Sequence, residues 1–190
     1  MNTQKARDLI KLFEGLRLRA YRDPVGVATI GYGHTQGVRM GDEITKEQAE
    51  ILLDLDMKPI IKKLESYDSK YHWNENEFNA LLSFAYNLGV GSIDQVTANG
   101  TRTKAEISSK MLLYYNAGGK RLEGLARRRQ KEHDLFIKPV IATNNNITEQ
   151  TTISEIVDLV YSGFFGNGED RKNNIYKLIQ SFVNERGMRK

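Results

Sequence analysis

Two acids and one hydroxyl near the start of the chain have the types and spacing that suit acid–base chemistry. Glu14 ends an amphipathic stretch, Asp23 opens an Asp-Pro turn, and Thr29 lies six residues later in an alternating apolar run. The negative end of a helix dipole, with the apolar neighbours Phe13 and Leu16, favours the protonated form of Glu14. Water and backbone amides around a turn are expected to keep Asp23 ionised.

Two carboxyls in such opposed environments suit glycoside hydrolysis. One group protonates the leaving oxygen, while the other supports attack by water or the developing positive charge. The hydroxyl of Thr29 returns toward Asp23 across the turn, where it could hold the attacking water. An ordinary surface glutamate beside a structural Asp-Pro turn would look the same, so the residues alone leave both interpretations open.

Local patterns predict the elements that position these three residues. Apolar spacing over residues 3–14 predicts an amphipathic helix, with Gly15 as its C-terminal stop. Alternation over residues 16–34, around the turn at 23–26, predicts a small antiparallel hairpin. Residues 37–44 continue as irregular or short-strand structure. Glu14 is therefore expected at a helix end, and Asp23 and Thr29 on the hairpin.

Further helices are expected to build the body of the domain. Asn74 and Glu77 form a capping pattern before a helix that is apolar on nearly every face, which places that helix at the domain centre. The other predicted elements are a helix from 46 to about 66 that opens with the capping box Thr45 to Gln48 and kinks at Pro59, a polar loop at 94–103, a helix that opens at Thr103 and Glu106 and ends at 117–119, and a helix at 123–137.

The composition is that of a globular protein, with 190 residues, 39% of them hydrophobic and 27% charged. The absence of cysteine rules out disulfides and thiolate metal sites, and His34, His72 and His133 lack metal-ligand spacing, so neither a metal nor a cofactor is expected. The net charge of +4 favours an anionic partner without choosing among nucleic acid, acidic glycan and membrane surface. With no signal-peptide pattern and no long apolar run, we expect synthesis in the cytoplasm and no stable membrane insertion.

The chain is expected to fold as an α+β protein in three parts. Residues 1–138 form a mainly helical domain with a small antiparallel β lobe. Residues 139–152 lack periodicity and are rich in Asn and Thr, which indicates a linker. Residues 153–190 show two helical patterns broken by a Gly-Phe-Phe-Gly-Asn-Gly stretch, which predicts a small all-helical module.

The spacing Glu-x8-Asp-x5-Thr, set within "EGLRL" and "TIGYGH", resembles the phage-type lysozymes of glycoside hydrolase family 24. The segments "EFNALLSFAYNLGVG" and "YNAGGKRLEGLARRRQKEHDLF" look like that family's central helix and closing segment, so the resemblance covers roughly residues 6–137. It implies a lysozyme-like fold and a muramidase that cleaves between N-acetylmuramic acid and N-acetylglucosamine in peptidoglycan. It gives Glu14 the general-acid position, and Asp23 and Thr29 the positions that handle the water.

The resemblance also concerns residues around the expected site. His34 is by itself most simply a structural histidine, and in the family pattern it pairs with an acid at the position of Asp56. One arginine among residues 127–129 is implied to face Glu14, and the sequence does not say which. The polar loop at 94–103, at the far wall of the expected cleft, departs from versions of the family with a longer helical stretch there.

The motif "GNGEDRKN" followed by "IQSFVNE" resembles the seventh family of cell-wall-binding repeats found at the C-terminus of some phage endolysins. The resemblance implies that Gly166, Asn167, Gly168, Asp170 and Arg171 bind the muramyl-peptide part of peptidoglycan. Phe165 replaces the usual Trp, and an Ala-Gly-Tyr-Asp segment is missing, so this copy is shortened. The alternative is a helical appendage that packs on the catalytic domain.

These resemblances predict a phage or prophage endolysin whose partner is bacterial peptidoglycan, with no role for nucleic acid. A wall hydrolase made in the host cytoplasm would need a holin for release to the wall. Two alternatives stay open: a lytic transglycosylase acting on the same bond, which uses one acid and no water, and a non-catalytic cell-wall-binding protein.

Overall fold

The computed structural model describes residues 1–117 and 120–138. The chain divides into two compact units, Met1–Phe136 and Ile137–Lys190, and almost all described residues belong to the first. The linker predicted at 139–152 and the helical module predicted at 153–190 lie outside the described residues. Within the described part, no helix combines the length and apolarity needed to span a membrane.

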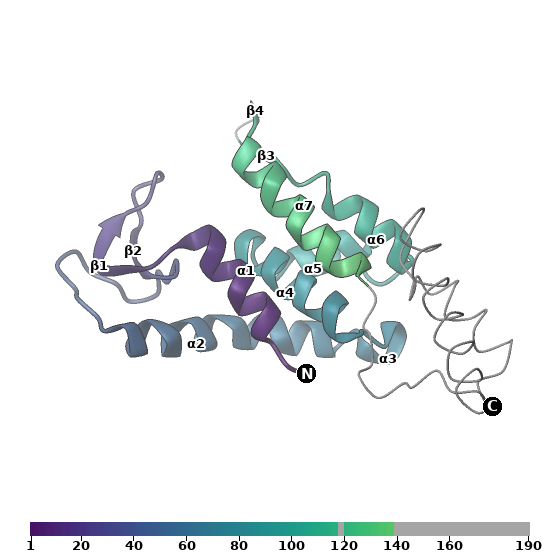
Figure 1. Ribbon diagram of the computed structural model, residues 1–190, viewed down its shortest axis with the longest axis horizontal. Coiled ribbons are helices and arrows are strands. Elements are labelled where there is room, and N and C mark those ends of the chain that lie inside the picture. The colour runs from purple at the N-terminus through teal and green to yellow at the C-terminus, as the bar shows by residue number, and fades with distance from the viewer. Residues whose placement is uncertain (118–119, 139–190) are drawn as a thin grey trace, which may run out of the picture. The chain divides into compact units, whose positions relative to one another are not determined.

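The described unit is mainly helical, with a two-stranded antiparallel sheet near its start (Figure 1), which confirms the predicted α+β class. Its elements, in chain order, are α1 (Gln4–Glu14), β1 (Arg17–Arg22), β2 (Ala28–Gly31), α2 (Lys46–Glu65), α3 (Asp68–Tyr71), α4 (Glu75–Leu88), α5 (Ser92–Thr97), α6 (Lys104–Met111), β3 (Asn116–Ala117), β4 (Lys120–Arg121) and α7 (Glu123–Ile137).

Helix α4 forms the centre of the unit, as its apolar pattern predicts. It begins with a capping box, in which Asn74 and Glu77 each accept a hydrogen bond from the other's backbone N–H at 2.9 Å. Every residue from Asn76 to Ala85 is buried, and α1, α2 and α5 all contact this helix. The packing of α1, α2 and α5 around α4 therefore holds in place the residues on the last two turns of this helix.

The hairpin of β1 and β2 has the predicted turn. Tyr21 lies opposite Thr29, and Arg22 lies opposite Ala28. The carboxylate Oδ1 of Asp23 accepts hydrogen bonds from the backbone N–H groups of Val25 at 3.0 Å and Val27 at 2.8 Å, so this acid closes the turn itself. The hairpin thereby fixes the side chain of Asp23 relative to both strands.

Helix α2 connects the hairpin to the helical core. It opens with the predicted capping box of Thr45 and Gln48, continues as one helix through Pro59, and contacts β2, α3 and α4. Near the start of α2, the Glu50 carboxylate forms ion pairs with Arg7 and Lys11 of α1. It also accepts a hydrogen bond from the hydroxyl of Tyr32, which follows β2. One carboxylate therefore joins three separate parts of the chain.

Two predictions about residues 94–117 are wrong. The expected polar loop at 94–103 begins in helix α5, because Ile93, Val96 and Thr97 repeat at helical spacing and are all completely buried. The helix that begins at Lys104 ends at Met111 and not at 117–119. The ring of Tyr114 packs edge-on against Phe84 with centroids 5.1 Å apart, and the chain then enters the hairpin of β3 and β4.

Candidate active site

Glu14 stands at the last position of α1, where Gly15 ends the helix with φ +67° and ψ 170°. This conformation is essentially restricted to glycine, so the sequence ends the helix directly after the acid. The Glu14 side chain is 24% exposed, and its Oε1 accepts a hydrogen bond from Nη1 of Arg128 at 2.5 Å. The acid therefore stands at the end of α1 with a buried guanidinium directly against it.

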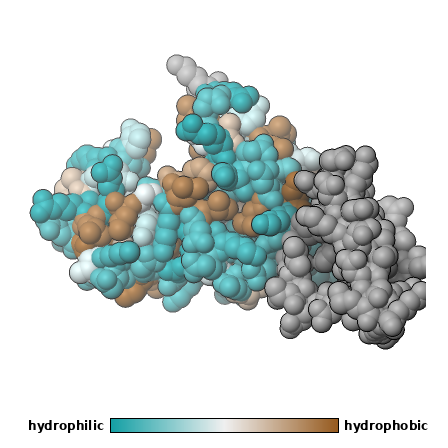
Figure 2. Space-filling model, viewed as in Figure 1, coloured by the Kyte–Doolittle hydropathy of each residue, from teal (hydrophilic) through white to brown (hydrophobic). Residues whose placement is uncertain are grey.

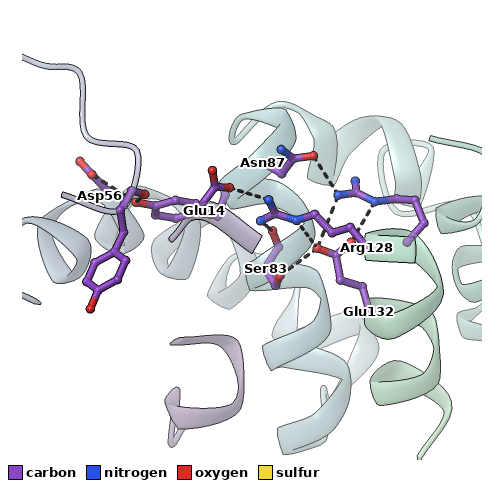
Figure 3. Close-up of polar contacts among 9 residues, drawn as sticks. Glu14, Asp56, Ser83, Asn87, Arg128 and Glu132 are labelled. Carbon is purple, nitrogen blue, oxygen red and sulfur yellow. Dashed lines mark hydrogen bonds and ion pairs between the residues drawn. The ribbon is translucent and has the colours of Figure 1, made fainter. Parts of the chain in front are cut away.

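Arg128 is the arginine that faces Glu14, which the sequence left open among residues 127–129. Its guanidinium is buried, with Nε donating to Glu132 Oε1 at 3.0 Å and Nη2 donating to the Ser83 carbonyl at 3.2 Å (Figure 3). The same guanidinium lies 5.4 Å from the centre of the Phe13 ring. Contacts on several sides thus direct one Nη group of Arg128 at the acid.

The two neighbouring arginines have different surroundings. Arg127 is exposed, whereas Arg129 is completely buried and donates through Nη2 to Asn87 Oδ1 at 2.9 Å. Glu132 also forms an ion pair with Arg129, between Oε2 and Nε at 3.0 Å, and accepts a hydrogen bond from the Ser83 hydroxyl at 2.8 Å. Glu132 was not among the residues expected at the site from the sequence, although its position four residues after Arg128 on a helix was a usable signal of the pairing.

Asp23 and Thr29 meet at the backbone of Val27. The Asp23 N–H donates to the Val27 carbonyl at 3.0 Å, and the Thr29 hydroxyl donates to the same carbonyl at 3.0 Å. No hydrogen bond or ion pair among residues 1–117 and 120–138 joins either side chain to Glu14. The segment that follows β2 comes close to the acid at Gly33. A Cβ added to Gly33 would lie 3.7 Å from Glu14 Oε2.

His34 and Asp56 form the pair that the family pattern implies. His34 Nδ1 lies 2.9 Å from Asp56 Oδ1, which joins the segment after β2 to α2. The hydroxyl of Tyr86, on α4, donates to the Tyr32 carbonyl at 2.9 Å. Burial raises the pKa of Tyr86 far above its usual range, and the carboxylates of Asp56 and Glu14 add to that effect, so this phenol is a neutral donor beside the site.

A cavity of about 820 Å³ opens beside Glu14, between the end of α1 and the first turns of α7. This volume is in the range of small-molecule binding sites. Apolar side chains gather over the C-terminal part of α1 in Figure 2, and Leu12 and Phe13 line the cavity. Its lining also includes four cationic side chains, Arg121, Arg127, Arg128 and Lys131. Asp23 and Thr29 do not line this cavity.

Comparisons with known proteins agree with this geometry. An endolysin of Lactococcus phage c2 is 42% identical over 154 residues, which cover 78% of this chain and 65% of that protein. Among solved structures, the muramidase domain of SpmX from Asticaccaulis excentricus is 35% identical with a TM-score of 0.64, covering 73% of this chain and 97% of that one. An endolysin from Escherichia coli O157:H7 phage FAHEc1 is also 35% identical, with a TM-score of 0.62 and coverage of 72% and 93%. Residues 11–132 match the family described as phage lysozyme, and the chain belongs to that family.

Proposed function

We propose that this protein is a phage or prophage endolysin and an N-acetylmuramidase of glycoside hydrolase family 24. It cleaves the bond between N-acetylmuramic acid and N-acetylglucosamine in peptidoglycan. The observation that carries the proposal is the Glu14 carboxyl, which lines an 820 Å³ cavity while a buried arginine holds it at 2.5 Å. The names of the relatives, endolysin and muramidase domain, support the same substrate class.

In the proposed reaction, Glu14 is the general acid that protonates the leaving oxygen. Its carboxylate gains negative charge as the proton leaves, and the adjacent guanidinium of Arg128 stabilises that charge. Arg128 is already in place at 2.5 Å, so this stabilisation requires no rearrangement during the step.

Asp23 and Thr29 are proposed to hold the attacking water. The Thr29 hydroxyl gives its proton to the Val27 carbonyl, so its oxygen keeps lone pairs that can accept a hydrogen bond from water. One carboxylate oxygen of Asp23 is taken up by two backbone amides, and the other is the one available to the water or to developing positive charge.

Replacement of the acid tests this proposal. Glu14→Gln keeps the shape of the side chain but removes the proton donor, so the clearing of purified cell walls should fall by at least ~10²-fold. Glu123→Gln is the matched control, because Glu123 is an exposed acid that lines the same cavity. Near-normal clearing by a folded Glu14→Gln protein would refute the assignment. Product analysis excludes the transglycosylase alternative if the new ends are reducing ends and not anhydro-muramyl ends.

We also propose a wall-binding role for residues 153–190 and a dependence on a holin for release from the host cytoplasm. The motif containing Asp170 and Arg171 supports the first, since a carboxylate and a guanidinium can together bind an amide-and-carboxylate ligand such as a stem peptide. The double variant Asp170→Ala, Arg171→Ala should then sediment poorly with intact walls yet still cleave soluble fragments. Unchanged sedimentation would favour a packing role for residues 153–190 over wall binding. Lysis of expressing cells that contain no holin would refute the proposed dependence on a holin.

A further inference from the structure

Glu132 is an acid in the interior of α7, in contact with the group that faces the proposed catalytic carboxyl. It is completely buried and does not line the cavity, so the substrate does not reach it there. A buried carboxylate is costly unless it is paired and hydrogen-bonded. Glu132 meets that condition through Arg128, Arg129 and the Ser83 hydroxyl.

We propose that Glu132 is a positioning residue for the reaction: it fixes Arg128 toward Glu14 and balances the second buried cation, Arg129. This inference rests on the proposed role of Glu14 as general acid. The Nε of Arg128 binds Glu132 and its Nη1 binds Glu14, so the planar guanidinium lies between the two carboxylates (Figure 3). A guanidinium held at one edge by a buried acid has its opposite donors aimed in a fixed direction.

The charges of this cluster balance only when all four ionisable members are counted. Arg128 and Arg129 supply two positive charges, and Glu132 and ionised Glu14 supply two negative charges. When Glu14 is protonated, as a general acid must be before it acts, the cluster carries one net positive charge. Glu132 therefore supplies the buried negative charge that offsets one of the two arginines while Glu14 holds its proton.

The pKa of Arg129 and the pKa of Glu132 each depend on the other charged groups of this cluster. Burial lowers the pKa of Arg129 to about 10, against the opposing effect of the Glu132 and Glu14 carboxylates. Burial also raises the pKa of Glu132, against the opposing effect of Arg129 and Arg128. A change of charge at one member is therefore expected to be felt at the others.

Other elements around Glu14 contribute few charges to this balance. Gly33 brings backbone next to the carboxyl from the hairpin side. Among the described residues, the charged and titratable groups packed around Glu14 are Arg128, Arg129 and Glu132 on α7, Tyr86 on α4 and, beyond Tyr86, Asp56 of α2 with its partner His34. Arg121, Glu123, Arg127 and Lys131 share the cavity lining with Glu14. Arg128 and Arg129 are the two buried cations of this set, so the buried cluster on α7 is where a charge change should affect the reaction most.

The test is the pH profile of wall cleavage by the full-length protein. If Glu14 is the general acid, activity should be lost toward alkaline pH as the acid loses its proton, and this alkaline limb must be absent from any residual activity of Glu14→Gln. Glu132→Gln keeps an acceptor for Arg128 but removes the charge, so the alkaline limb of kcat should move down by about one pH unit. KM should change little, since the side chain lies outside the cavity.

Arg129→Gln provides the opposite test, because it removes a cation and leaves Glu132 to act on Arg128 alone. The alkaline limb should then move to higher pH. Asp134→Asn is the matched control, since it removes one negative charge from an exposed position on the same helix and should leave the profile unchanged.

The outcomes separate the two proposals. If the wild-type protein cleaves no wall, or if Glu14→Gln keeps the alkaline limb, the proposed function fails. If the wild type has the limb but a folded Glu132→Gln leaves it in place, the charge of Glu132 does not act on the reaction through the arginines, and the inference is overturned. Should Glu132→Gln not fold, Arg129→Gln decides alone, and a limb that is unmoved or moves to lower pH overturns the inference.

Discussion

Glu50 offers a direct test of how α1, α2 and the hairpin are held together. Its Oε2 lies 2.7 Å from Lys11 Nζ and 2.6 Å from Arg7 Nη2, and its Oε1 accepts from the Tyr32 hydroxyl at 3.0 Å. Glu50→Gln keeps one acceptor and the side-chain shape but removes the charge. We expect the free energy of unfolding of the described unit to fall at neutral pH.

The size of the loss follows from the contacts. Hydrogen bonds to charged groups contribute about 1.5–3 kcal/mol each when buried. The Glu50 side chain is 26% exposed, which weakens both ion pairs, and Arg7 keeps its second partner Asp54 after the change. The expected loss is therefore about 1–2 kcal/mol.

The loss should also depend on pH in a defined direction. Burial would raise the pKa of Glu50, but the hydrogen bonds from Lys11, Tyr32 and Arg7 outweigh burial and lower it. A pKa lowered by folding contributes stability that is present above the unfolded value of about 4.3 and disappears as pH falls through the folded value. Wild type and Glu50→Gln should thus differ most near pH 7 and converge in acid.

The assay is denaturant unfolding at several pH values, followed by the fluorescence of Trp73, which is the only tryptophan of the chain and is buried in the described unit. Glu65→Gln is the control, because it makes the same chemical change at an exposed position of α2 and should alter stability by less than about 0.5 kcal/mol. A difference between wild type and Glu50→Gln that is equally large at pH 7 and pH 3 would refute the argument.

Three further substitutions test local features, each measured by the same unfolding assay. Asn74→Ala removes the cap of α4 and should cost about 1 kcal/mol; no loss would mean that the capping box does not stabilise this helix. Ile93→Ala should cost about 2–5 kcal/mol because α5 buries this side chain completely, whereas a loop residue would cost little. Gly15→Ala meets no atom within 4 Å, but its backbone conformation should cost about 1–3 kcal/mol, and wall clearing should fall because Glu14 is adjacent.

The features predicted from the sequence are those that a few neighbouring residues determine. The capping boxes at Thr45 and Asn74, the stop at Gly15 and the Asp-Pro turn at Asp23 each involve contacts within about five positions, and the structure has all four. The pairing of Glu14 with Arg128 joins residues 114 positions apart, so no local pattern could choose Arg128 over its neighbours.

The errors have a related physical cause. Helix α5 has only six residues, too few for its apolar spacing to stand out in a polar stretch. The end of α6 depends on tertiary packing, since Tyr114 contacts Phe84 of α4 and no glycine or proline marks Met111 as a stop. The spacing of Glu132 from Arg128 could suggest that the two residues pair, but not that they are buried, because charged residues on a helix usually face solvent.

The central position of α4 divides the proposed site into two parts with different dynamics. Ser83, Tyr86 and Asn87 of this helix bind Arg128, the Tyr32 carbonyl and Arg129, so the arginine that faces the acid is attached to an element that we expect to open only when the whole unit unfolds. Asp23 and Thr29 belong instead to a two-stranded hairpin, which has little stability of its own and depends on the packing of β2 against α2. Amide hydrogens of the hairpin should therefore exchange with solvent long before those of α4. A fluctuation that opens the hairpin would release the groups proposed to hold water and leave the proton donor in its place.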